Sequence, residues 1–289
     1  MMNKRLEAYS ALVDKKMHTY LNDERIPLEL REAMSYSVFA GGKRLRPALV
    51  LASCELFEGD FEKALPFACA IEMIHTYSLI HDDLPAMDND DYRRGRLTSH
   101  KVFGEDKAIL AGDGLLSLAF DVMLNAAETK GCLNAAKYVS YAAGVKGMVA
   151  GQWVDVGSNG VKISAETMEY IHLNKTAAMI IGAIKAGAAC AGASDNDIKT
   201  LEEYATEIGY TFQIVDDILD VEGDSEELGK ATGSDEANNK TTYVTLYGIE
   251  GAREKATEHT EKAISAISRY GEKAQFFVEL ARYMLVRKK

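Results

Sequence analysis

Apolar side chains recur at helical spacing in almost every segment of this 289-residue chain. Residues three and four positions apart share one face of a helix, so the spacing predicts helices that each bury one face. No run of alternating β-branched residues is long enough to predict a sheet. We therefore expect an all-α fold. The expected helices span residues 3–22, 28–40, 44–58, 62–84, 105–128, 132–150, 164–173, 175–193, 196–222, 241–247, 249–270 and 273–286.

The composition limits the number of domains and the kinds of partner. The chain has only 4 Pro and no Pro- or Ser-rich linker, which favours a single domain over residues 1–289. Its net charge of −11 argues against nucleic acid or an anionic membrane surface as a partner. The stretch 176–193 is apolar, but Lys185 in its middle favours a packed interior helix over a membrane span. We expect a cytoplasmic protein, because its four cysteines are scattered and no secretory leader precedes them.

Two clusters of aspartates lie far apart in the chain, each within an apolar helical stretch. They are Asp82-Asp83-Leu84-Pro85-Ala86-Met87-Asp88 and Asp216-Asp217-Ile218-Leu219-Asp220. Carboxylates at this spacing repel one another, so they need cations, and a hard divalent metal is the natural one. Pro85 should end the first helix and place Asp88 on the following turn. In the second cluster Asp216 and Asp220 share one helix face, which Gln213 extends.

Basic residues accompany the first cluster. Arg93 and Arg94 follow it, and three cations lie upstream in Gly41-Gly42-Lys43-Arg44-Leu45-Arg46-Pro47. Mg²⁺ is usually shared between one or two carboxylates and substrate phosphates. A guanidinium group can donate two parallel hydrogen bonds to the oxygens of one phosphate. The combination predicts an enzyme that binds magnesium and a diphosphate.

Two polar segments and one helix start complete the candidate site. Residues 223–240 form a polar, glycine-dotted loop directly after the second cluster, and we expect this loop, which carries Lys230, to act as a lid. Residues 89–101 form a similar loop after the first cluster. Lys175 and Thr176 should open a helix, where a lysine is electrostatically unfavourable, and this suggests a ligand nearby.

These motifs, with Ala111-Gly112-Asp113 and Gly151-Gln152-x2-Asp155, resemble the trans-isoprenyl diphosphate synthases over nearly the whole chain, and most of all the bacterial farnesyl diphosphate synthases. The resemblance implies an isoprenoid-synthase-type helical bundle around a central cavity, with the two Asp-rich helices facing each other. It also implies a homodimer and three Mg²⁺ ions with substrate bound.

The resemblance assigns roles to the matching residues. Asp82 and Asp88 would hold Mg²⁺ against the allylic diphosphate with Asp83 in support, and the second cluster would hold a further ion. The predicted metal ligands are Asp82, Asp83, Asp88, Asp216, Asp217 and Asp220. The allylic diphosphate would contact Arg93, Lys230 and Lys240. The site for isopentenyl diphosphate would comprise Gly42, Lys43, Arg46, His75 and Arg94. The catalytic residues would be Lys175, Thr176 and Gln213, which line the space where positive charge develops, together with Asp82, Asp83 and Asp216.

The implied reaction is ionisation of an allylic diphosphate, attack by the double bond of isopentenyl diphosphate, and loss of a proton. In the family, an aromatic residue five positions before the first Asp is associated with C15 products, and Tyr77 has that position. Helical-wheel arithmetic alone brings Ser78 nearer the Asp82 face, so Tyr77 and Ser78 are both chain-length candidates. We expect farnesyl diphosphate as the product.

Several alternatives stay open. A geranylgeranyl (C20) or geranyl (C10) diphosphate synthase differs mainly in pocket depth. A terpene cyclase would not use the second anion site, a non-catalytic subunit would not need both aspartate motifs, and a metal-dependent phosphohydrolase would leave the second cluster unexplained. The sequence departs from the family at Asn89, where some members carry Asp, and at Gly233-Ser234, which replaces a Gly-Lys pair.

Overall fold

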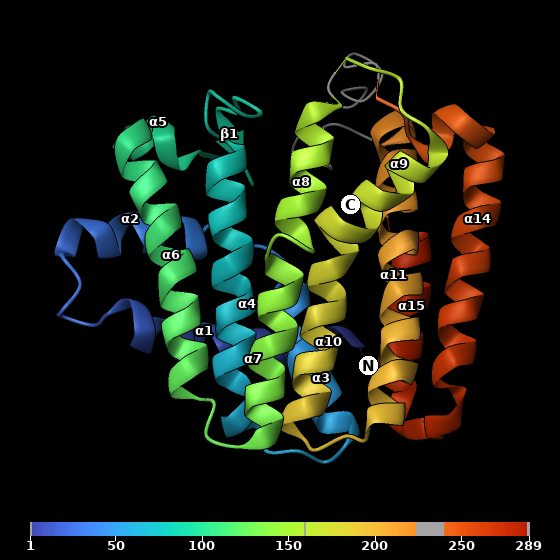
Figure 1. Cartoon of the computed structure of the whole chain (residues 1–289), viewed down its shortest axis with the longest axis horizontal. Coiled ribbons are helices and arrows are strands. Elements are labelled where there is room, and N and C mark those ends of the chain that lie inside the picture. The colour runs from blue at the N-terminus through green and yellow to red at the C-terminus, as the bar shows by residue number, and fades with distance from the viewer. Residues whose placement is uncertain (1, 159, 224–239, 288–289) are drawn as a thin grey trace. The chain divides into compact units, whose positions relative to one another are not determined.

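The computed structural model describes residues 2–158, 160–223 and 240–287 (Figure 1). The chain divides into two compact units: unit 1 consists mainly of residues 3–139 and 186–192, and unit 2 mainly of 140–185 and 193–289. In the described part of both units, helices form all regular structure except one two-stranded hairpin, so the predicted all-α class is confirmed. The single domain over 1–289 and the facing Asp-rich helices stay predictions.

Unit 1 consists of helices and a short hairpin. Its elements are α1 (Met2–Leu21), α2 (Leu28–Val38), α3 (Leu45–Leu56), α4 (Phe61–Asp82), β1 (Tyr92–Arg93), β2 (Arg96–Leu97), α5 (Ser99–Phe103), α6 (Glu105–Asn125), most of α7 (Lys130–Ala143) and the end of α10 (Ala178–Cys190). Helix α4 is buried on almost every side, as expected for a central helix, and it packs against α3 and α6.

Helix α4 begins and ends where its sequence predicts. The carboxylate of Asp60 caps its start by accepting a hydrogen bond from the backbone N–H of Glu62. The helix ends at Asp82, three residues before Pro85, and Asp88 lies in the turn that follows. This ending confirms the prediction drawn from Pro85.

The segment predicted as a loop over residues 89–101 contains more structure than expected. β1 and β2 pair antiparallel, with Arg93 opposite Arg96, and Arg94 and Gly95 form the turn between them with φ of 54° and 74°. Two consecutive residues with positive φ match the twist of a tight hairpin. The strands are only two residues long, which is too short for a periodic sequence signal.

All regular secondary structure in the described residues of unit 2 is helical. Its elements are α8 (Met148–Gly157), α9 (Ala165–Ile171), a π-helix (His172–Ala177), the start of α10, α11 (Asp195–Glu222), α14 (Tyr243–Ile267), a 3-10 helix (Ser268–Ala274) and α15 (Gln275–Val286). Within this unit α11 lies beside α14 and α15 (Figure 1). Capping boxes at Ser194 and Thr242 fix the starts of α11 and α14.

Two predicted helix boundaries in this region are wrong. The helix expected over 132–150 is two helices, because the chain breaks between Gly144 and Gly147. A side chain at Gly147 would overlap the backbone carbonyl of Ala142. The break expected near residue 174 is absent, because the π-helix joins α9 to α10 without interruption. By contrast, the break expected at residue 248 is present as a non-helical Gly248 within α14.

One helix among the described residues, α6, is long and apolar enough to cross a membrane by length and composition, and 39% of its most apolar window is buried in the fold. Most of the stretch 176–193, considered earlier for a membrane span, lies in α10 (Ala178–Cys190), in which Ala183, Ile184 and Ala186 are fully buried.

Candidate active site

The first aspartate cluster lies at the end of α4. Asp82 is the last helical residue, and the backbone N–H of Asp88 donates to the Asp82 carbonyl over 2.8 Å. Asn89 directly follows Asp88. Its φ of 54° suits asparagine better than most residues, and its backbone N–H donates to the carbonyl of Leu84. The turn thus keeps Asp82 and Asp88 near one another on the same end of the helix.

Asp83 differs from its neighbours because it is buried. Its carboxylate accepts a hydrogen bond from the Arg93 guanidinium over 2.6 Å, and Arg93 also lies 3.4 Å from Asp90. Burial raises the pKa of Asp83, while Arg93 opposes that shift. Asp83 therefore holds Arg93 beside the cluster. This contact fits a supporting role for Asp83 more closely than direct metal ligation.

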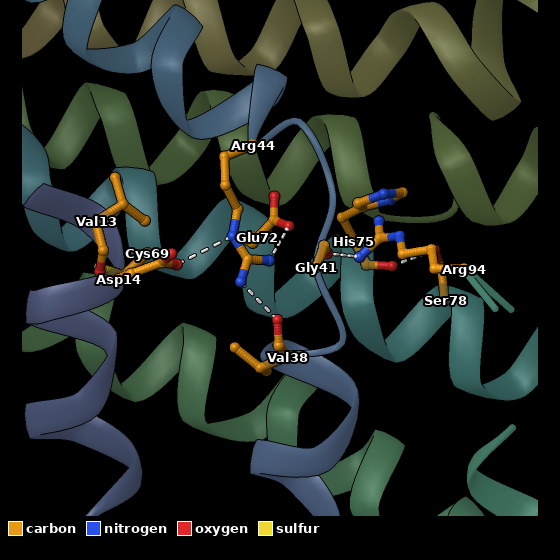
Figure 2. A network of polar contacts seen from close by, with 10 residues as sticks. All are labelled: Val13, Asp14, Val38, Gly41, Arg44, Cys69, Glu72, His75, Ser78 and Arg94. Carbon is orange, nitrogen blue, oxygen red and sulfur yellow. Dashed lines mark hydrogen bonds and ion pairs between the residues drawn. The ribbon is translucent and has the colours of Figure 1, made fainter. Parts of the chain in front are cut away.

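The predicted second anion site lies on the loop before α3. Arg94 donates to the carbonyl of Gly41, as Figure 2 shows, and its guanidinium lies against Gly42. A Cβ atom at Gly42 would lie 2.7 Å from Arg94 Cζ, and the φ of this residue is +123°. Gly42 is therefore required both for the backbone conformation and for the close approach of Arg94. Lys43 is exposed and Arg46 half-buried.

Arg44 does not join the other cations of this loop. It has a left-handed backbone, with φ of 48°, and its buried side chain lies between three helices (Figure 2). The guanidinium donates to Asp14 over 3.0 Å, to Glu72 over 2.8 Å and to the carbonyl of Val38 over 2.6 Å. Arg44, which the predicted anion site leaves out, therefore anchors the loop to these helices.

His75 and Ser78 lie close to the same loop. The Ser78 hydroxyl donates to the carbonyl of His75 over 2.9 Å (Figure 2). Burial, followed by the charges of Arg46 and Arg94, lowers the pKa of His75 well below its usual range. The imidazole is therefore neutral at pH 7 and can accept or donate a hydrogen bond without adding charge.

Tyr77 is 8% exposed and lies on α4 five residues before Asp82. Its ring packs edge-on against His81, with 5.6 Å between ring centroids. Burial, with a smaller effect of Asp82, raises the pKa of Tyr77. Tyr77 is thus fixed in the core of unit 1, whereas Ser78 is half-buried and bonded to its own helix.

In unit 2 two members of the second cluster, Asp217 and Asp220, are buried, and Asp217 is hydrogen-bonded on two sides. Its carboxylate accepts from the Gln213 amide over 3.1 Å and from the backbone N–H of Tyr243 over 2.9 Å. The Thr176 hydroxyl in turn donates to the Gln213 carbonyl oxygen over 3.3 Å. Gln213 therefore pairs with Asp217, its neighbour four residues further along α11.

Asp216 is partly exposed and pairs with a residue that sequence reasoning did not single out. The guanidinium of Arg287 donates to Asp216 over 2.6 Å and to the carbonyl of Phe212 over 2.9 Å. A basic residue near the chain end carries no periodic signal, so its partner could not be predicted. Asp220, the last member of the cluster, is 4% exposed.

A cavity of about 120 Å³ lies beside this hydrogen-bonded chain in unit 2. Its polar lining includes Asp155, His172, Lys175, Gln213, Asp217 and Lys240. Lys175 pairs with Asp155 over 2.5 Å, and a Cβ atom at Gly151 would overlap the backbone of Lys175. Lys175 and Thr176 lie inside the π-helix, not at a helix start as predicted. Such π-helical turns are frequent at functional sites.

His172 was missed by the sequence reasoning. It is 8% exposed, lines the cavity and stacks on Tyr243 with 5.5 Å between centroids. Its Nδ1 is buried and has no hydrogen-bond partner among the described residues. Burial lowers the pKa of His172 to about 4, so it is a neutral group available to a ligand. Lys230, Gly233 and Ser234 lie outside the described residues.

The carboxylates present fit a hard divalent metal. No three His, Cys, Asp or Glu side chains among the described residues are close enough to form a metal cage. Mg²⁺ does not need such a cage, because it takes one or two carboxylates and fills its remaining positions with water and phosphate. Asp82 and Asp88, joined by one turn, provide a donor set of this kind.

A sequence profile described as Polyprenyl synthetase matches residues 27–280. The chain belongs to the polyprenyl synthetase family. A farnesyl diphosphate synthase of Geobacillus stearothermophilus is 48% identical over 87% of this chain and 86% of its own length. A chloroplastic geranylgeranyl pyrophosphate synthase of Catharanthus roseus is also 48% identical, over 91% of this chain and 75% of its own length.

Solved structures agree with the fold. The crystal structure of an FPP/GFPP synthase from Zymomonas mobilis covers 98% of both chains with a TM-score of 0.87 at 37% identity. A geranyltransferase from Legionella pneumophila gives the same TM-score at 33% identity. This polyprenyl synthetase is accordingly a prenyltransferase of isoprenoid biosynthesis of the trans-prenyl synthase type. The individual roles assigned to its site residues stay predictions.

Proposed function

We propose that this prenyltransferase condenses isopentenyl diphosphate with dimethylallyl or geranyl diphosphate and releases (2E,6E)-farnesyl diphosphate and diphosphate. The observation that carries the C15 product is Tyr77. It is a buried aromatic residue on α4, five positions before Asp82 and one turn before His81, which packs against it. At about 1.5 Å per residue, its Cα lies about 7.5 Å down the helix axis from Asp82, where it would end the pocket for the growing chain.

Mg²⁺ neutralises the charge that develops on the departing diphosphate and so makes it a better leaving group. Asp82 and Asp88 would hold ions at the end of α4, and Asp216 would hold a further one on α11. Arg93 is partly buried beside Asp83, which supports its assignment to the allylic diphosphate. We propose three ions with substrate bound.

The unit 2 residues suit a site where positive charge develops. The Gln213 amide is oriented by Asp217 on one side and by Thr176 on the other, so its dipole is fixed before substrate binds. Preorganised dipoles of this kind stabilise developing charge without reorganising during the reaction. The base that takes the final proton is proposed to be the departing diphosphate, as the family resemblance implies.

Geranylgeranyl diphosphate is the second candidate product. Two relatives of this chain are geranylgeranyl pyrophosphate synthases that are 47–48% identical to it. They are as similar to it as the Geobacillus farnesyl diphosphate synthase is. Overall identity therefore does not separate the two products, and the proposal for C15 depends on Tyr77.

The test incubates the purified chain with isopentenyl and dimethylallyl diphosphates, with Mg²⁺ or with EDTA, and identifies the dephosphorylated products by chromatography and mass spectrometry. Farnesol that forms only with Mg²⁺ is the expected result. Geranylgeraniol as the main product would overturn the C15 proposal. Absence of any condensation product from folded protein would favour a non-catalytic subunit or a phosphohydrolase.

A substitution tests the role of Tyr77 directly. Tyr77→Ala should lengthen the product by at least one five-carbon unit, because it removes the proposed pocket floor, whereas Ser78→Ala should change product length less. An unchanged product from an active Tyr77→Ala enzyme would contradict the assignment.

We further propose that the enzyme is a cytoplasmic homodimer, and light scattering of the purified chain tests the oligomeric state.

A further inference from the structure

His81 connects Tyr77 to the neighbouring helix α6. Its ring Nε2 lies 3.1 Å from the carbonyl oxygen of Ile109. A carbonyl oxygen can only accept, so Nε2 carries the hydrogen and donates it. The imidazole is therefore tied to α6, while its backbone belongs to α4. Both helices belong to unit 1.

Gly112 provides the space that the imidazole occupies. A Cβ atom at Gly112 would overlap His81 Nε2 and lie 2.6 Å from Cδ2, and the three atoms closest to it all belong to His81. Glycine weakens the interior of a helix, so a buried glycine within α6 requires a reason in packing. The reason here is the ring of His81, and no larger residue fits without moving that ring.

Tyr77 packs against the same His81 ring that contacts α6. The two rings lie at 82° with 5.6 Å between centroids, the edge-to-face geometry that aromatic rings prefer. The structure thus links Gly112, His81 and Tyr77 in order. Gly112 admits the imidazole, the Ile109 carbonyl fixes it, and the imidazole restricts the orientation of the Tyr77 ring.

We infer that His81 and Gly112 are positioning residues for product length. This inference rests on the proposed role of Tyr77 as the pocket floor. With His81 held in the Gly112 space, the Tyr77 ring stays in the one orientation that stops chain growth at C15. Without that support the ring reaches other rotamers, and a fraction of the product is extended by a further isopentenyl unit.

The measurement is the ratio of C20 to C15 product at equal conversion and saturating isopentenyl diphosphate. This ratio does not depend on how much of the enzyme is active, so a general loss of folding does not change it. His81→Ala should raise the ratio about three- to ten-fold, the range expected from losing one edge-to-face ring contact. Tyr77→Ala should raise it more.

A double-mutant cycle tests whether Gly112 acts through His81. Gly112→Ala alone should raise the ratio to a similar extent as His81→Ala, because the new methyl group displaces the imidazole. In the His81→Ala background the same substitution has space for its methyl group, so it should change the ratio less than two-fold. Residues that act through one contact give such non-additive effects.

Gly114→Ala is the matched control. It lies on the same helix, and its Cβ would contact Met34 Sδ at 3.0 Å rather than His81, so the product ratio should stay that of the unsubstituted enzyme. An unchanged ratio in both His81→Ala and Gly112→Ala, or additive effects in the double variant, would overturn the inference.

The failure of this inference is distinguishable from failure of the proposed function. If Tyr77→Ala leaves product length unchanged, or if the unsubstituted enzyme makes no C15 product, the proposed function fails. If Tyr77→Ala lengthens the product while His81→Ala and Gly112→Ala do not, only the inference fails. Should His81→Ala prove insoluble, the Gly112→Ala and Gly114→Ala pair still decides the question.

Discussion

At the scale of single residues, Arg44 lies buried between α1, α2 and α4 with its charge opposed by Asp14 and Glu72. These contacts separate Arg44 from Lys43 and Arg46, the two cations of this segment that the resemblance assigns to an anion site. The prediction left Arg44 out of the anion site but did not identify Asp14, Val38 or Glu72 as its partners. The left-handed backbone of Arg44 accompanies contacts to three helices that are distant in the sequence. No local sequence pattern predicts such a conformation for an arginine.

Removing one partner of this buried network should destabilise the folded protein. Glu72→Gln leaves the Arg44 guanidinium with a weaker partner in a buried site, so the free energy of unfolding should fall by about 3 kcal/mol. Urea denaturation measures the loss. Glu7→Gln removes the same charge from an exposed position on α1 and should change stability by less than about 0.5 kcal/mol. Equal effects of the two substitutions would contradict the structural role of the network.

The buried His172 predicts a dependence of stability on pH. Its pKa is about 4 in the folded protein and near 6.5 when unfolded, so the unfolded state binds more protons between these values. The contribution of His172 to the free energy of unfolding should therefore be complete above pH 6.5 and decrease as the pH falls toward 4. Between pH 7 and pH 5 this residue should account for a loss of about 2 kcal/mol. Urea denaturation of the protein and of His172→Gln at both pH values measures the difference, which the substitution should reduce.

At the scale of elements, helix type and most helix starts could be predicted because they depend on local signals. Asp60, Ser194 and Thr242 cap α4, α11 and α14 within a few residues of the predicted starts. The π-helix over His172–Ala177 could not be predicted, because it differs from an α-helix only by a changed hydrogen-bond register. The contact between the backbone N–H of Tyr243 on α14 and Asp217 on α11 could not be predicted either, because it joins two elements that are distant in the sequence.

Close helix packing gives a prediction about glycine. A Cβ atom at Gly187 on α10 would overlap the carbonyl oxygen of Val50 on α3 and lie 2.8 Å from the carbonyl carbon. Backbone cannot yield as a flexible side chain can, so Gly187→Ala should destabilise the protein by about 3 kcal/mol. Gly157→Ala, at the end of α8 with no atom within 4 Å of its Cβ, should be neutral or slightly stabilising. Thermal unfolding of the two variants compares them; equal melting temperatures would contradict the packing argument.

At the scale of the whole molecule, the protein and its proposed ligands have charge of the same sign. The chain carries a net charge of −11, and a diphosphate is also negative, so cations must accompany the ligand. The net charge could be read from the composition, the fold class from the spacing of apolar residues, and both aspartate clusters from the sequence itself. The product length was predicted only through the family resemblance at Tyr77, because it depends on the orientation of a few packed side chains.

This charge balance predicts which ligands stabilise the protein. Diphosphate alone should leave the melting temperature unchanged, whereas Mg²⁺ with diphosphate at about a hundred times the dissociation constant should raise it by about 5 °C or more. Asp82→Asn with Asp88→Asn should abolish the rise, while Asp91→Asn, an exposed aspartate paired with Lys101, should retain it. A rise with diphosphate in EDTA would contradict the metal requirement. Differential scanning fluorimetry provides the measurement.

Helix α10 has a consequence for biosynthesis, because the boundary between the two units falls inside it. Residues 186–192 complete unit 1, and Gly187 there packs against Val50, yet they are translated only after residues 140–185 of unit 2. At about 5–20 residues per second, the ribosome takes several seconds to make that interval. During this time the apolar face of α3 that α10 later covers is exposed in the nascent chain. Chaperone binding should therefore be greatest after residue 139 has been synthesised and before residue 192 has emerged from the ribosome.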